Sequence, residues 1–415
     1  MEASHKYSED NVKAILAKIS SQIPKVLLGR ERQEHIAKIM NKLPEEIREA
    51  LKNRFDSNLY AMAEREASDI DFGGTGCNGY VWYRIFGEKQ PEKQFGHFSL
   101  DESDALILNI LTVRDQEHLF ANRYVDFSYT VTIGGAHARF RATAYLELNH
   151  LGLNMRLIAN RIRPFRSLGL HDEVAKLLSL KYVKQGLVLI TGITGSGKST
   201  TLDTIIDANN RTSNAHIVII SNPVEYVHES ERSIVRHREV GRDVLTFKEG
   251  TIQALRQDPD IIVIGEMRDP ETIATVLEVA DSGHKVFSTL HTSSTTESID
   301  RILGETTPQE QLRIRERLAD VLTCVISQKL IPSTDKKLIL AKEVLIATSA
   351  VRTAIRNNHT DEIYQLIYQS NHLGMITMEQ DLVRLYRHEK ISYQQAYSHA
   401  NHKKRFEDLI KYFNN

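Results

Sequence analysis

The sequence predicts an α/β protein that carries a second, strand-rich α+β domain and helical additions at both ends. Short apolar strands alternate with helical stretches from about residue 166 onward, as in a protein with a parallel sheet. A glycine-rich loop lies between one of these strands and the next helix. Between residues 59 and 165, segments rich in β-branched and aromatic residues follow one another instead. These three observations predict the fold class.

The composition sets limits on the class of protein. Lys and Arg number 53 and Asp and Glu 54, so the formal net charge is −1. This balance argues against a protein that coats nucleic acid, because counterion release requires a surplus of basic residues. The two cysteines, Cys77 and Cys324, cannot build a disulfide framework or a cysteine-ligated zinc site, which favours a reducing cytoplasm. We find no signal-peptide core, and the apolar runs are too short to span a bilayer.

Residues 1–58 are predicted to form a helical N-terminal extension. Pro44, followed by Glu45 and Glu46, suits the start of a helix, with proline at its first position and acids near its positive end. The segment carries no chemical motif, so simple packing is favoured over a docking role. Apolar residues recur at helical spacing, as at Val12, Ile15, Leu16 and Ile19.

Residues 59–165 are predicted to form a compact antiparallel sheet with one or two helices. A helix is expected over Ser99–Leu111, with Ser99 as its N-cap, and a linker over residues 164–167. The expected strands are Tyr80–Phe86, Phe127–Ile133, Arg139–Leu146 and Asn154–Ala159.

Residues 166–415 are predicted to form the α/β domain. Gly186–Thr191, Ile217–Ser221 and Ile261–Gly265 are short, apolar and largely β-branched, as buried parallel strands tend to be. The last hundred residues are expected to be mainly helical and to pack as a C-terminal helical region.

The glycine-rich loop satisfies the phosphate-loop pattern G-x-x-x-x-G-K-[ST] over Gly192–Ser199. It follows the strand Gly186–Thr191 and precedes a helical stretch over Thr200–Ala208, so backbone N–H groups and the helix N-terminus can bind phosphate. Lys198 would reach the β- and γ-phosphates, and Ser199 would supply a hydroxyl to Mg²⁺. The residues predicted to bind the nucleotide here are Gly192, Thr194, Gly195, Ser196, Gly197, Lys198, Ser199 and Thr200.

Two glutamates follow other predicted strands of the same sheet. Glu266 comes directly after the strand Ile261–Gly265, where it can hold the Mg²⁺ shell through water or polarise the attacking water. A helix-capping role is its alternative. Glu225 is the only carboxylate in the turn after Ile217–Ser221 and is the second candidate for metal or water, with a surface ion pair as its alternative.

Two histidines flank a predicted strand over Lys285–Leu290. His284 precedes the strand and His291 follows it, and each can form hydrogen bonds to a phosphate without ligating metal. Taken singly, a structural role is the more common one for such a histidine.

Several stretches together resemble a known family. They are the phosphate loop, Pro223–Glu229, Asp258–Ile273, Gly283–Ser294, Val325–Pro332 and Ala350–Arg356, and they are similar to the secretion traffic ATPases, most closely the type IV pilus retraction branch. The resemblance runs from about Leu59 to the end of the chain.

The resemblance implies a RecA-like ATPase core and a PAS-like N-terminal domain that form cytoplasmic hexamers. It implies ATP with Mg²⁺, an inner-membrane platform protein as the partner at the cytoplasmic face, and a phosphate-sensing role for His284 and His291. It also implies that Arg139, Arg141 and Arg156 reach the nucleotide from the N-terminal domain, which suits the planar guanidinium fork.

The sequence departs from the family pattern at Ser221 and Asn222, which replace two acids and leave Glu225 alone. Two cysteines also cannot make the tetracysteine zinc module of many extension-motor relatives. The leading interpretation is therefore a retraction motor. A DotB-like ATPase of a secretion or conjugation system, a DNA translocase and a weakly catalytic scaffold are the alternatives.

Overall fold

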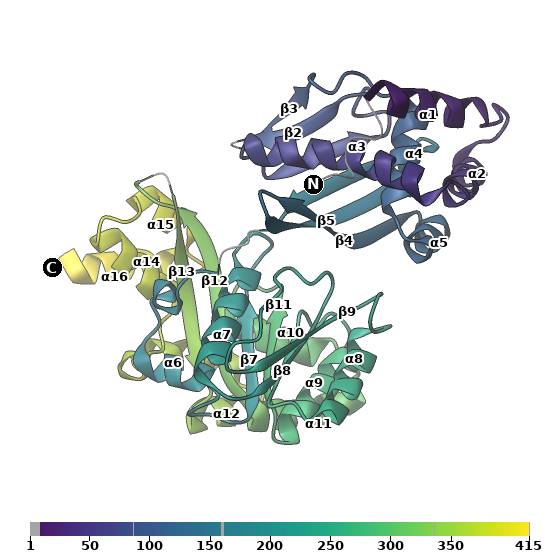
Figure 1. Cartoon of the computed structure of the whole chain (residues 1–415). Helices are drawn as coiled ribbons and strands as arrows, with labels where there is room; N and C mark the ends of the chain where they lie inside the picture. The colour runs from purple at the N-terminus through teal and green to yellow at the C-terminus, as the bar shows by residue number, and fades with distance from the viewer. Residues whose placement is uncertain (1–8, 86, 159–161, 336, 415) are drawn as a thin grey trace. The chain divides into compact units, whose positions relative to one another are not determined.

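The computed structural model describes residues 9–85, 87–158, 162–335 and 337–414. The chain divides into two units, Met1–Asn160 and Arg161–Asn415 (Figure 1). Phe86 and Ala159, the expected last residues of two strands, lie outside the described residues, as do residues 1–8 of the expected extension.

The first unit contains a six-stranded antiparallel sheet in the order β3-β2-β1-β6-β5-β4. The described residues of this unit also form five helices. The elements are α1 (Glu9–Ser21), α2 (Gly29–Asn41), α3 (Glu45–Glu64), β1 (Asp69–Gly73), β2 (Val81–Ile85), β3 (Glu88–Glu92), α4 (Leu100–Ile110), α5 (Val113–Asn122), β4 (Tyr124–Ile133), β5 (Ala136–Glu147) and β6 (His150–Leu157).

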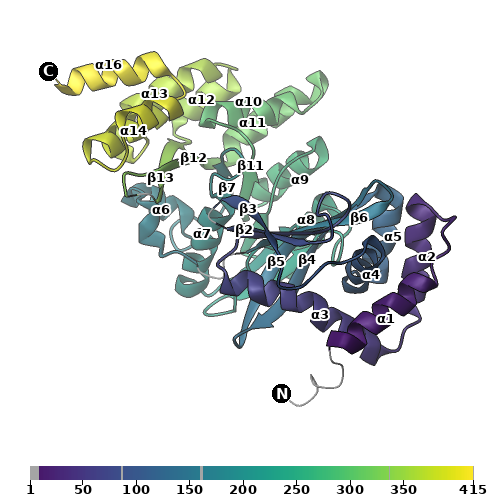
Figure 2. The same cartoon turned by 90° about the horizontal axis from the view of Figure 1, so that it is seen from above.

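One apolar core holds the helices and the sheet of this unit together. Leu16 of α1, Met40 of α2 and Phe55 of α3 are buried in it with Phe140 and Met155 of the sheet. Helices α1, α2 and α3 each contact α4 (Figure 2). The helices expected as a separate extension therefore share their core with the sheet.

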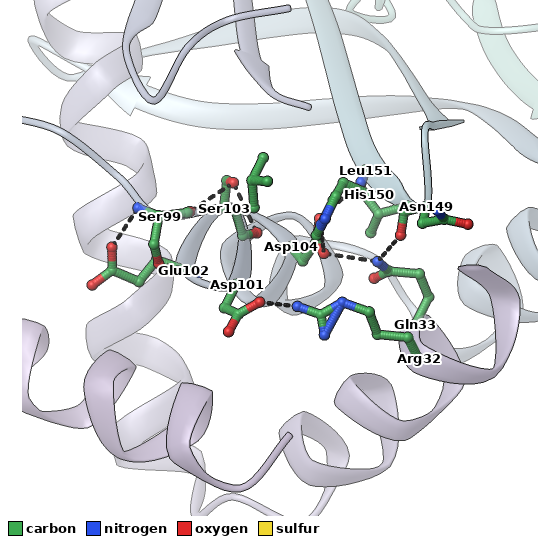
Figure 3. A network of polar contacts seen from close by, with 11 residues as sticks. Arg32, Gln33, Ser99, Asp101, Glu102, Ser103, Asp104, Asn149, His150 and Leu151 are labelled. Carbon is green, nitrogen blue, oxygen red and sulfur yellow. Dashed lines mark hydrogen bonds and ion pairs between the residues drawn. The ribbon is translucent and has the colours of Figure 1, made fainter. Parts of the chain in front are cut away.

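A buried carboxylate ties α2 to the sheet (Figure 3). Asp104 of α4 has no exposed surface, and its Oδ2 accepts a hydrogen bond of 2.7 Å from Gln33 Nε2 and lies 3.0 Å from His150 Nδ1. Its Oδ1 accepts a hydrogen bond of 2.7 Å from the backbone N–H of Leu151. Ser99 caps α4 through a capping box with Glu102, which confirms the predicted N-cap.

Replacing Asp104 by alanine is expected to destabilise the first unit by about 2–4 kcal/mol, because the Leu151 N–H loses its buried acceptor and Gln33 and His150 lose a shared partner. Hydrogen exchange of peptides from α2 and α4 is the measurement, and both should exchange faster. The exposed Glu117 is the control, and Glu117→Ala should change local stability by less than about 0.5 kcal/mol. Equal protection in Asp104→Ala and wild type would contradict this account of the packing.

The second unit contains a seven-stranded sheet in the order β13-β12-β7-β11-β10-β8-β9. All neighbouring strands run parallel except β13, which is antiparallel to β12. Its strands are β7 (Gly186–Thr191), β8 (His216–Ser221), β9 (Ile234–Glu239), β10 (Ile261–Ile264), β11 (Lys285–Leu290), β12 (Leu322–Pro332) and β13 (Leu338–Ile346).

Helices cover both faces of this sheet. Helices α6 and α7 pack on one apolar layer, and α9, α10, α11 and α12 pack on the other. Helices α14, α15 and α16 form a further apolar cluster with β12 and β13, visible in yellow beside these strands in Figure 1. No helix in the described part of the chain has the length and apolar character needed to cross a bilayer. The helices are α6 (Asp172–Leu178), α7 (Lys198–Thr212), α8 (Phe247–Ala254), α9 (Pro270–Asp281), α10 (Thr295–Gly304), α11 (Pro308–Val321), α12 (Ser349–Arg356), α13 (Ile363–Gln369), α14 (Met378–Arg387), α15 (Tyr393–His399) and α16 (Lys403–Asn414), with short 3-10 turns at η1 (Phe165–Leu168), η2 (Leu255–Gln257), η3 (Thr360–Glu362) and η4 (Asn371–Leu373).

The structure differs from the sequence prediction in three respects. Strands β1, β3 and β9 are not among the predicted strands, and β12 and β13 interrupt the C-terminal region that is expected to be mainly helical. Pro44 is the N-cap of α3, one position before its first residue Glu45, whereas the sequence predicts Pro44 as the first helical residue. The expected linker at residues 164–167 is largely the 3-10 turn η1.

Candidate active site

The candidate site lies along one edge of the sheet of the second unit. Strands β7, β11, β10 and β8 are parallel neighbours in this order, so their C-terminal ends meet at the same edge. The phosphate loop follows β7, His291 follows β11, Glu266 follows β10 after one glycine, and Glu225 lies in the turn after β8. The strand order therefore places these four predicted elements in one row.

The phosphate loop requires glycine where the backbone passes close to β12. A Cβ on Gly192 would lie 2.6 Å from the backbone oxygen of Gln328 and 2.3 Å from Ser196 Oγ. Gly197 is the N-cap of α7 with φ of +84°, and no side chain caps this helix. The first N–H groups of α7 are thus left for an anion, as a phosphate site requires.

Lys198 is folded back onto the phosphate loop. Its Nζ donates to the backbone oxygens of Gly192 and Ile193, at 2.7 and 3.1 Å. Burial lowers the pKa of Lys198, while Glu266 and Glu225 act in the opposite direction. The lysine charge is thus held next to the loop, with two carboxylates near enough to stabilise it.

Glu266 lies between the cationic side chain of Arg268 and the imidazole of His291. Its Oε2 is 2.6 Å from Arg268 Nε and 3.8 Å from His291 Nε2. Its side chain is only 13% exposed. The cap of α9 is Asp269, which accepts from the Thr272 N–H, so Glu266 does not have the capping role that the sequence left open.

His291 bridges the phosphate loop and Glu266. Its Nδ1 lies 3.5 Å from Lys198 Nζ, and its Nε2 faces Glu266. Burial and then the Lys198 charge hold the pKa of His291 below its usual value of 6.5, although Glu266 opposes the shift. The imidazole is therefore neutral at pH 7, with one nitrogen able to donate and one able to accept.

The expectation that His284 joins His291 near the phosphate is wrong within the subunit. The His284 backbone oxygen accepts from the N–H of Gly186, the first residue of β7, and its Nδ1 lies 2.9 Å from Ser282 Oγ. At about 3.3 Å per residue, β7 separates this edge from the phosphate loop by roughly 17 Å. His284 and His291 lie at opposite ends of β11, so only His291 is at the sheet edge that carries the phosphate loop.

Glu225 is positioned by the turn that follows β8. The N–H of the preceding Val224 donates to Glu239 Oε2 at 3.1 Å, and Ser221 Oγ donates to the Pro223 oxygen at 3.0 Å. The charge of Glu225 acts on the pKa of Lys198. Glu225 is therefore part of the electrostatic environment of the site, and Ser221 holds the turn that carries it.

The hydroxyls of the phosphate loop fit a nucleotide with Mg²⁺. Ser196 Oγ is buried and has no hydrogen-bond partner among the described residues. Ser199 is the second residue of α7. Thr194, before it in the sequence, and Thr200, directly after it, are both exposed. Within the described part of the chain, no group of three His, Cys, Asp or Glu side chains could hold a metal by itself. The Ser199 hydroxyl and the Glu266 carboxylate suit Mg²⁺, which is usually held by one or two side chains together with phosphates and water.

The three arginines predicted to reach the nucleotide belong to the first unit. Arg141 of β5 is the register partner of Arg156 of β6, and Arg139 lies two residues from Arg141 on the same face. Arg156 Nε donates to Asp69 Oδ1 at 2.8 Å. Burial raises the pKa of Asp69, but hydrogen bonds from Ser68 and Arg156 outweigh it, so this pKa lies below its usual value.

Two residues of the site escaped the sequence analysis. Arg268 pairs with Glu266, and Gln328 Nε2 donates to the Ser196 backbone oxygen at 2.7 Å. Both lie in stretches that carried the family resemblance. Arg268 is two residues from Glu266, a spacing that could have indicated it, whereas Gln328 is 132 residues from its partner.

We predict that His291 titrates below pH 6.5, and that Lys198→Ala raises this pKa by removing a neighbouring positive charge. Histidine ring resonances followed by NMR are the measurement, with His291→Gln to identify the signal. The unfolded state takes up this proton at a higher pH than the folded state. The contribution of His291 to the free energy of unfolding is therefore lost as the pH falls below 6.5. Titration at or above pH 6.5, or no change in Lys198→Ala, would contradict the described environment.

Comparison with known proteins decides the family. The family model described as "Type II/IV secretion system protein" matches residues 100–410, well over half of the chain. The chain belongs to this family. Its relative in Pseudomonas aeruginosa, the type IV pilus retraction ATPase PilT, is 41% identical over 275 residues, which cover 66% of this chain and 78% of PilT.

Solved structures of family members share the fold. The crystal structure of the pilus retraction motor PilT with bound ADP matches with a TM-score of 0.75 at 36% identity, over 84% of this chain and 98% of PilT. The ATPase DotB of Legionella pneumophila matches with a TM-score of 0.67 at 26% identity, over 83% and 94% of the two chains. These matches confirm the predicted α/β class with a RecA-like ATPase core.

Proposed function

We propose that this family member is an ATP-hydrolysing motor of a type IV pilus machine and drives retraction and twitching motility. The row of Lys198, His291, Glu266 and Glu225 at one sheet edge carries this proposal, because it joins a phosphate loop to carboxylates that can act on water. The identity to the retraction ATPase PilT supports the pilus as the machine on which the motor acts.

Each side chain of the row has a distinct part in the reaction. Lys198 stabilises the charge that develops on the β- and γ-phosphate oxygens as the terminal bond breaks. Glu266 orients and polarises the attacking water. His291 spans these two groups and donates or accepts a hydrogen bond at the phosphate, and Glu225 is the alternative carboxylate for the water.

The nucleotide is bound by the loop from Gly192 to Thr200, and the ADP in the PilT structure supports this assignment. Ser199 directly, and Glu266 through water, would hold Mg²⁺. When bound, the ion supplies positive charge at the phosphate oxygens. The buried Ser196 Oγ would gain a partner from the phosphates or their water.

We further propose that the motor is a homohexamer at the cytoplasmic face of the inner membrane, where it transmits work to a platform protein. Arg139, Arg141 and Arg156 are further candidates to bind the nucleotide through their guanidinium groups. The family model and the likeness to the pilus retraction motor PilT support action with such a machine.

The likeness to DotB supports a second candidate, an ATPase of a type IV secretion or conjugation system. A strain that lacks the chain distinguishes the two. Loss of twitching with retained surface pili, restored by wild type but not by Lys198→Ala, supports the pilus motor. Loss of substrate or DNA transfer with normal twitching supports the secretion system.

Phosphate release from Mg–ATP by the purified chain is the biochemical test. Hydrolysis that is lost in EDTA and is unaffected by added DNA agrees with the proposal. Tight ATP binding without turnover would favour the scaffold, and a DNA stimulation that weakens steeply with salt would favour a translocase.

A further inference from the structure

Two consecutive residues of β12 connect the phosphate loop to the C-terminal helices. Gln328 is buried, and its Nε2 holds the backbone oxygen of Ser196 in the loop. The next residue, Lys329, turns the other way, and its Nζ donates to the His399 oxygen at 2.7 Å and to Asn401 Oδ1 at 2.6 Å. The segment between α15 and α16 is thus tied to the strand that supports the loop.

Asn401 extends this connection to the segment that carries His291. Its Nδ2 donates to the backbone oxygen of Ser293 at 3.3 Å, two residues beyond His291. The orientation of the amide is fixed by chemistry, because Lys329 can only donate and a backbone oxygen can only accept. An aspartate at this position could keep the first bond but not the second.

Buried carboxylates hold the two sides of this contact in place. Glu343 of β13 accepts from the N–H and the hydroxyl of Thr295, both at 2.7 Å, at the start of α10. Glu379 of α14 accepts from the N–H of His402 at 2.8 Å, directly after Asn401. Burial lowers the pKa of Lys329, and both glutamates oppose this shift. The Ser293 segment and the Asn401 segment are therefore each fixed next to the bond that joins them.

We propose that Asn401 is a positioning residue for ATP hydrolysis. Its carboxamide holds the segment from His291 to Ser293 in the position that places the His291 ring next to Lys198. Asn401 itself contacts neither Lys198 nor Glu266 in the described hydrogen bonds; its effect passes through Ser293 to His291. The segment between α15 and α16 thereby sets the geometry of the catalytic edge. This inference rests on the proposed ATPase function.

Asn401→Ala is expected to lower kcat about tenfold, because a small displacement of a positioned group is costly, while ATP affinity changes less than about twofold. Asn401→Asp should lower kcat to a similar extent, since it also lacks the donor to Ser293. Asn371→Ala is the matched control. Asn371 also donates to a backbone oxygen of the C-terminal region, that of Met375 at 2.9 Å, and should keep wild-type kcat.

A double-mutant cycle separates positioning from a general loss of structure. In the His291→Ala background, Asn401→Ala should lower kcat no further. The same fold loss in both backgrounds, or wild-type kcat in Asn401→Asp, would overturn the inference. Hydrogen exchange of a peptide over residues 289–296 gives a readout without turnover, and it should be faster in both Asn401 variants than in Asn371→Ala.

The two proposals fail in different ways. A wild-type chain that never hydrolyses Mg–ATP would contradict the proposed function and the role of Asn401 in it. An active wild type whose kcat and exchange are insensitive to the Asn401 substitutions would contradict the positioning role alone.

Discussion

Replacing Lys198 by alanine is expected to lower ATP turnover by about 10²–10³-fold or more, the cost of removing one preorganised charge donor from a transition state. Lys198 Nζ already lies on the backbone oxygens of Gly192 and Ile193, with His291 at 3.5 Å. A shorter side chain leaves the phosphate oxygens without this cation. Phosphate release under saturating Mg–ATP is the measurement.

Lys248→Ala is the matched control for this experiment. Lys248 is a lysine of the same unit whose Nζ pairs with Glu271 at 2.7 Å on the surface, outside the row of site residues. Its removal should leave turnover within about twofold of wild type. Near-wild-type turnover in purified Lys198→Ala would remove the basis for the phosphate loop as the catalytic site.

Glu266→Gln is expected to bind ATP normally but to lower kcat by about 10²–10⁴-fold, the usual range for loss of a general base. The amide keeps the size of the side chain, but it cannot polarise water as a carboxylate does. It also loses the charge that pairs with Arg268 at 2.6 Å. Nucleotide affinity and single-turnover rate, measured separately, distinguish binding from chemistry.

Glu271→Gln is the control here, because Glu271 is 70% exposed and makes only the surface pair with Lys248 among the described ion pairs. It should keep wild-type kcat. If Glu266→Gln turns over at the wild-type rate and Glu225→Gln does not, the water-activating role belongs to Glu225. If neither substitution slows turnover, the assignment of carboxylate chemistry to this edge is wrong.

The strands that carry the site could be predicted because they are buried on both faces. Gly186–Thr191 and Lys285–Leu290 match β7 and β11 residue for residue, since a continuous apolar run flanked by polar residues marks a parallel strand. The phosphate loop, Glu266 and His291 followed from what lies at the ends of these strands. The strand order then brought them together.

Strands β3 and β12 gave no such signal. Strand β3 reads EKQPE and has no apolar alternation, because it is an edge strand that is mostly exposed. Strand β12 contains a lysine and a glutamine near its end, and these interrupt its apolar pattern. Both side chains have partners far away in the sequence, so only the structure explains them.

The same limit applies to the site. His284 and His291 look equivalent in the sequence, but a parallel strand sends its two ends to opposite edges, and only His291 reaches the phosphate loop. Gln328 and Asn401 meet their partners across 132 and 108 residues. No local pattern indicates contacts of that range.

Mg²⁺-dependent ATP hydrolysis per subunit, measured over a range of protein concentrations with the assembly size recorded at each, decides whether the chain is an assembling ATPase. If the proposed hexamer forms the active species, the rate per subunit rises cooperatively as the chains assemble. Lys198→Ala should show no such activity at any concentration. No Mg–ATP hydrolysis by the fully assembled wild-type chain would contradict the proposed function.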